Sequence, residues 1–155
     1  MGATQLLTPQ TQAAPVPLKV EDNWAAGVSI KTPTRVVFVS EQDRLPVFMK
    51  IPGGRRRAGD ATKLATALRE GFEETGIKLK PHELRHLKSY DRHNHTYELF
   101  VAEIADERLA EAYDIAKNGE KVHILTYAEA RAARGKILPV HLRMIDEHNL
   151  LVGRS

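Results

Sequence analysis

The chain has 155 residues and a formal net charge of +3, with 42% hydrophobic and 28% charged residues. These values are typical of a globular protein, and the mild charge argues against a dedicated nucleic-acid-binding protein. The absence of cysteine excludes disulfides and thiolate metal sites.

The amino-terminal stretch is polar, contains Ala and Pro, and has neither the basic nor the apolar region of a secretory signal. No apolar run approaches the roughly 18 residues that span a membrane. We therefore predict a disordered tail at residues 1–15, a single domain at residues 16–155, and a cytoplasmic location without a membrane partner. The domain is expected as a monomer or a homodimer.

Two short runs rich in β-branched and aromatic residues predict the first strands, at residues 34–40 and 45–51. The polar sequence EQDR lies between them, so the two strands are expected to form a hairpin. Pro52, Gly53 and Gly54 then end the second strand and begin a loop.

The sequence TKLATALREGFEET predicts a helix over residues 62–75. Leu64, Leu68 and Phe72 recur at helical spacing, so we expect an apolar face with Phe72 anchored in the core. Asp60 or Thr62 can cap the start of this helix, and Gly76 follows its end, where a left-handed residue is favoured.

The rest of the chain alternates between strand and helix patterns. The predicted elements are a short strand at 77–79, paired strands at 84–93 and 95–105, a helical segment at 106–119, a strand at 121–127, and helices at 128–135 and 139–153. This order predicts an α/β (α+β) fold with a mixed sheet between helices.

Three carboxylates are concentrated near the end of the helix at 62–75, at Glu70, Glu73 and Glu74. Residues three and four positions apart are neighbours on a helix, and the negative helix terminus disfavours anions. A bound Mg²⁺ offsets this repulsion, because it takes several carboxylate oxygens as ligands. The alternative is an ordinary solvated helix end.

The same residues resemble the signature of the Nudix hydrolase family. Gly54 is followed by the five residues RRRAG and then by Asp60, where the family has Glu, and REGFEETGI matches at Arg69, the three glutamates, Gly76 and Ile77. There are three departures. Asp replaces the first Glu, eight residues rather than seven separate it from Arg69, and Gly71 replaces an aliphatic residue.

The resemblance implies a Nudix-type α/β/α sandwich and a pyrophosphatase that hydrolyses a nucleoside diphosphate linked to another moiety, with Mg²⁺ or Mn²⁺. By position it implies Gly54, Glu70, Glu73 and Glu74 as metal ligands. Catalytic roles fall to Glu73, Glu74 and Arg69, and we add Glu120 as a candidate distant acid, although its position before a strand also suits an exposed turn.

Arg55, Arg56 and Arg57 follow Gly54 directly and are candidates for binding substrate phosphates, or else form a solvated loop. The expected partner is a nucleotide-type small molecule. The only nucleic acid expected as a possible partner is the 5′ end of an RNA. Two alternatives remain open, an RNA 5′-end pyrophosphohydrolase and a non-catalytic regulator that binds a nucleotide. For His93 and His95, surface or substrate contact is favoured over metal binding.

Overall fold

The computed structural model describes residues 22–153, so the tail predicted at residues 1–15 lies outside the described residues. The strands are β1 (Trp24–Lys31), β2 (Arg35–Glu41), β3 (Met49–Lys50), β4 (Gly53–Arg55), β5 (Leu84–Asp91), β6 (Thr96–Glu103) and β7 (Glu120–Thr126). The helices are α1 (Lys63–Thr75), α2 (Tyr127–Ala132) and α3 (Pro139–Glu147), with short 3₁₀ helices at Pro81–Glu83, Asp106–Glu111 and Arg134–Lys136.

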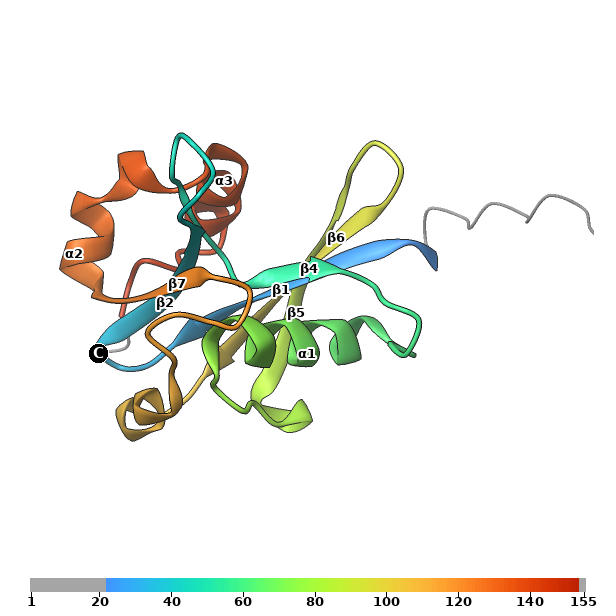
Figure 1. Ribbon diagram of the computed structural model, residues 1–155, viewed down its shortest axis with the longest axis horizontal. Helices are drawn as coiled ribbons and strands as arrows, with labels where there is room; N and C mark the ends of the chain where they lie inside the picture. The colour runs from blue at the N-terminus through green and yellow to red at the C-terminus, as the bar shows by residue number, and fades with distance from the viewer. Residues whose placement is uncertain (1–21, 154–155) are drawn as a thin grey trace, which may run out of the picture.

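All seven strands belong to one mixed sheet (Figure 1). The hydrogen-bonded order is β3-β2-β1-β6-β5, while β4 pairs with β1 and β7 pairs with β2. The β1–β6 pair is parallel, and the other strand pairs are antiparallel. Strands β1 and β2 each pair with three neighbouring strands, and β1 also forms the parallel pair with β6.

Helices cover both faces of the sheet, as the α/β/α expectation requires. On one face, α1 contributes Ala67 to a core that includes Val28 and Val37. On the other face, α2 and α3 contribute Ala130 and Ile145 to a second core. Figure 1 shows α2 and α3 lying close together at one end of the molecule, apart from α1.

Several element predictions are confirmed, and others are wrong in extent. β2 and β3 pair antiparallel as expected, but β3 is only two residues long. The strand expected at 77–79 is absent from the described structure, and within 106–119 only Asp106–Glu111 is helical, as a 3₁₀ helix. The last helix ends at Glu147.

Among residues 22–153, no helix is long and apolar enough to cross a membrane.

Helix α1 begins and ends as predicted, because the Ala65 N–H donates to the Thr62 side chain at its start and a left-handed Gly76 follows its end. The prediction for Phe72 is wrong, because this residue is 43% exposed. A methyl group at Gly71 would lie 3.1 Å from Val28 Cγ1, so the helix approaches β1 through this glycine. The face that carries Glu70 and Glu74 is consequently turned inward.

Candidate active site

The carboxylates of α1 occupy two different environments. Glu70 and Glu74 are buried, at 6% and 5% exposure, whereas the Glu73 side chain is 38% exposed. The backbone N–H of Gly53 donates a hydrogen bond to Glu74 Oε1 at 3.0 Å. Glu70 lies against Gly54 so closely that a methyl group there would come within 2.6 Å of its carboxylate carbon. The glycines of β4 thus let the acidic helix contact the backbone directly.

Asp60 supports the loop that precedes α1, although it stands one residue out of register. Its side chain accepts hydrogen bonds from Arg57 N at 3.0 Å and from Thr66 Oγ1 at 2.9 Å. The guanidinium of Arg69 donates to both carboxylate oxygens, and this contact holds the pKa of Asp60 well below its usual range. The extra residue therefore does not prevent Asp60 from closing the loop.

Arg69 also binds the carboxylates of its own helix. Its Nη1 lies 2.7 Å from Glu70 Oε2 and 3.1 Å from Glu73 Oε1. Its Nη2 donates to the backbone carbonyl of Arg55 at 3.1 Å. One guanidinium therefore joins the loop after β4 to the acidic turn of α1 and offsets part of the negative charge there.

Glu120 is buried at the start of β7, at 6% exposure, which excludes the exposed-turn interpretation. Its Oε2 lies 3.5 Å from Lys50 Nζ, while its buried Oε1 has no hydrogen-bond partner among the described residues. Burial, reinforced by the negative charge of Glu120, raises the pKa of Glu74 to about 9. Glu74 and Glu120 therefore approach each other across the site, one from α1 and one from the sheet.

These residues have the donor chemistry that a divalent cation requires. A buried carboxylate oxygen without a partner is a costly arrangement unless a cation or proton satisfies it. Nevertheless, within residues 22–153 no group of three or more His, Cys, Asp or Glu side chains is drawn together as a ready-made metal cluster. In the described structure Glu70 and Glu73 are both paired with the Arg69 guanidinium.

The three consecutive arginines have different environments. Arg56 stacks on the Trp24 ring at 4.1 Å and donates to the Asp60 carbonyl at 3.2 Å, so its guanidinium is held against β1 and the loop. Arg57 lies 3.1 Å from Glu73 Oε2 in an exposed ion pair. Arg55 is exposed at the end of β4. Arg55 is therefore the best placed of the three to contact a ligand.

Two contributions to the site were missed by the sequence reasoning. Lys50 reaches Glu120 from β3, and a charged residue directly before Ile51-Pro52-Gly53 was the available signal. Trp24 donates from Nε1 to Thr66 Oγ1 at 2.9 Å, which links β1 to the side chain that also binds Asp60. The partner of Trp24 was not identified from the sequence, because the strand that contains Trp24 was not predicted.

The histidines near the β5–β6 turn belong to no group of three or more His, Cys, Asp or Glu side chains that could hold a metal ion within the described residues. His93 is exposed, and His95 has its pKa lowered by burial and by the charges of Arg55 and Arg92. Tyr97 is buried at 8% exposure.

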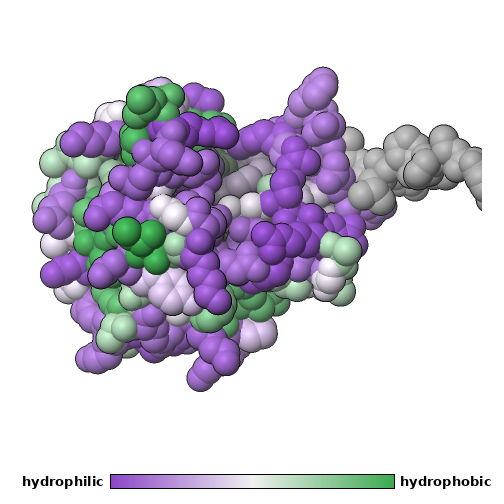
Figure 2. Space-filling model, viewed as in Figure 1, coloured by the Kyte–Doolittle hydropathy of each residue, from purple (hydrophilic) through white to green (hydrophobic). Residues whose placement is uncertain are grey.

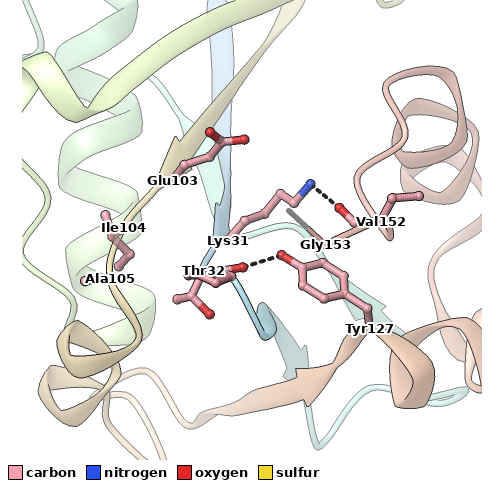
Figure 3. A pocket seen from close by; sticks show the side chains of 9 residues that line it. Lys31, Thr32, Glu103, Ile104, Ala105, Tyr127, Val152 and Gly153 are labelled. Atoms are coloured by element: carbon pink, nitrogen blue, oxygen red, sulfur yellow. Dashed lines mark hydrogen bonds between the residues drawn. The ribbon is translucent and has the colours of Figure 1, made fainter. Parts of the chain in front are cut away.

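A pocket of about 330 Å³ lies elsewhere, beside the end of β1 (Figure 3). Lys31 Nζ donates to the Val152 carbonyl at 3.0 Å, and Tyr127 Oη donates to the Thr32 carbonyl at 2.7 Å. The acids of α1 do not line this pocket. On the molecular face shown in Figure 2, hydrophilic side chains predominate, with separate hydrophobic patches between them.

Comparison with known proteins agrees with the geometry. The model of the NUDIX domain matches residues 23–147. A MutT protein from Bacillus halodurans has a similar structure, with a TM-score of 0.63 and 19% identity over 85% of this chain and 84% of that one. A NUDIX hydrolase from Nitrosomonas europaea gives a TM-score of 0.60 and 17% identity, with coverage of 83% and 88%. No curated protein matches the sequence.

Proposed function

Because the match over residues 23–147 shows that the chain belongs to the Nudix family, we propose that it hydrolyses the pyrophosphate bond of a nucleoside diphosphate linked to another moiety, with Mg²⁺ or Mn²⁺. The observation that carries this proposal is the burial of two acids, Glu74 on α1 and Glu120 on β7. Two acids share a buried site, and Glu120 Oε1 has no hydrogen-bond partner among the described residues. Such an arrangement is costly for folding and is typical of a functional site.

In this proposal the metal is held by Glu70, Glu73 and Glu74, with the carbonyl of Gly54. When bound, the divalent ion offsets the charge of the pyrophosphate oxygens and acidifies a water molecule. The protein keeps the ligands in place through the close packing of Gly54 on Glu70 and the hydrogen bond from Gly53 N to Glu74. Both contacts are made by residues without side chains, so the two carboxylates pack directly against the backbone of β4.

Glu120 accepts the proton of the attacking water in this scheme. Its position on β7 fixes it opposite α1, and its unpartnered Oε1 has the lone pairs that a general base needs. Arg69 is a positioning residue, because it joins Asp60 to the acidic turn. Arg55, exposed at the end of β4, contacts a phosphate of the substrate.

The deciding experiment is a hydrolysis panel with purified protein in Mg²⁺ or Mn²⁺. The substrates are nucleotide sugars, dinucleoside polyphosphates, NAD-type compounds and triphosphorylated RNA. We expect phosphate or nucleotide release from at least one of them, abolished by EDTA. Release from RNA alone would identify the 5′-end activity, and binding without turnover of any substrate would overturn the enzyme proposal in favour of a nucleotide-binding regulator.

A further inference from the structure

Lys50 lies between two carboxylates at the edge of the candidate active site. Its Nζ is 3.1 Å from Glu41 Oε2 and 3.5 Å from Glu120 Oε2. The Lys50 side chain is 23% exposed and that of Glu120 is 8% exposed, so the contact is largely withdrawn from solvent. An ammonium group in this position is an alternative to a metal ion as the counter-charge of the acids.

The strand register explains why this lysine faces the acids. Lys50 is opposite Val39, and Val39 in turn is opposite Val122. Glu41 and Glu120 form the cross-strand pair two residues further along. Since side chains two residues apart in a strand share a face, Lys50 and both glutamates project to the face covered by α1. Glu74 lies on that same face, and its charge also acts on Lys50.

We infer that Lys50 is a positioning residue that serves as the built-in counter-ion of Glu120 and that competes with the divalent cation for the acidic site. The inference rests on the proposed function, because it assumes that a metal binds beside Glu74. A fixed positive charge stabilises buried carboxylates when no metal is bound, and the same charge repels an incoming cation.

The test uses Lys50→Met, which keeps the length of the side chain but removes its charge. The matched control is Lys121→Met, because Lys121 is exposed and adjacent to Glu120 in the chain but points to the opposite face of β7. Mn²⁺ affinity is measured without substrate by electron paramagnetic resonance, and thermal unfolding is measured in EDTA. Neither readout depends on catalytic activity.

We expect Lys50→Met to bind Mn²⁺ about tenfold more tightly than the wild type and to melt at a lower temperature in EDTA. Lys121→Met should match the wild type in both measurements, and Lys50→Arg, which retains the charge, should keep the wild-type affinity. If Lys50→Met does not fold, Lys50→Gln replaces it. Equal or weaker Mn²⁺ binding by the neutral variant would overturn the inference.

The possible failures are distinguishable. If the wild type binds Mn²⁺ but its affinity is unchanged in Lys50→Met, the role of Lys50 is wrong and the proposed metal site stands. If neither protein binds Mn²⁺ or Mg²⁺, both the metal site and the competition are wrong. Stability in EDTA that is the same in Lys50→Met and Lys121→Met would contradict the counter-ion role independently of metal.

Discussion

Arg69 donates from Nε to Asp60 Oδ1 at 3.0 Å and from Nη2 to Asp60 Oδ2 at 2.7 Å. This side-on pair crosses from the loop after β4 to the acidic turn of α1. Asp60, although one residue out of register, therefore joins the loop to the helix through Arg69.

Asp60→Asn should destabilise the protein by about 2–4 kcal/mol at pH 7, because it leaves the Arg69 guanidinium without its main partner. The pKa of Asp60 is lowered by folding, so its contribution is present above the unfolded value of 3.8 and is lost as the pH falls below it. Urea unfolding at pH 7 and pH 3 should therefore show a difference from the wild type that shrinks in acid. The exposed Asp43→Asn is the control, and an equal effect from it would contradict the pairing argument.

Glu74→Gln should reduce turnover by at least about 100-fold and yet stabilise the metal-free protein in alkali. Folding raises the pKa of Glu74 from 4.5 to about 9, so the folded state binds the extra proton between these values. Wild-type stability must then fall as the pH rises through this window, whereas glutamine has no proton to lose. Thermal melting in EDTA from pH 5 to pH 9 measures the difference, and parallel curves for the two proteins would contradict the burial argument.

Gly54→Ala should impair the site, whereas Gly59→Ala in the same loop should not. A methyl group at Gly54 would approach the Glu70 carboxylate oxygens to 2.7 and 2.8 Å, but at Gly59 it would meet nothing within 4 Å. We expect a loss of at least about tenfold in kcat/KM for Gly54→Ala and wild-type activity for Gly59→Ala. If Gly54→Ala and Gly59→Ala had similar kcat/KM values, the close contact between Gly54 and Glu70 would not be required for activity.

Phe72→Ala should lower the free energy of unfolding by less than about 1 kcal/mol. Phe72 is 43% exposed, and its ring centroid lies 6.4 Å from that of Tyr113. The comparison is Phe38→Ala, at a residue 1% exposed, for which the loss should be about 3–5 kcal/mol. Chemical denaturation of both variants measures these losses. If Phe72→Ala destabilised the protein as much as Phe38→Ala, Phe72 would be a core residue, as helical spacing predicted.

The features that local sequence controls were predictable. Thr62 and Gly76 mark the ends of α1 through their capping chemistry, and the spacing of the three glutamates follows from helical geometry. β1 was missed because its sequence, WAAGVSIK, has no polar alternation and is rich in small residues. A strand buried on both faces has no periodic signal, so its central place in the sheet is a property of the tertiary structure.

The orientation of α1 could not be predicted from the local sequence. Periodicity placed Phe72 in the core, but the small Gly71 lets the helix approach Val28 and turns the carboxylates inward. The roles of Lys50 and Trp24 depend on contacts with residues far away in the chain. Such pairings arise only when the sheet and the helix pack together.

The burial of Glu74 and Glu120 should affect which substitutions appear when variants of the protein are selected for heat resistance. A fold that buries two acids gives up conformational stability there, and neutral residues at these positions would recover part of it. In a library selected for heat resistance alone, these two positions should therefore be among the first to change. A library required also to retain turnover should keep both and gain its heat resistance elsewhere.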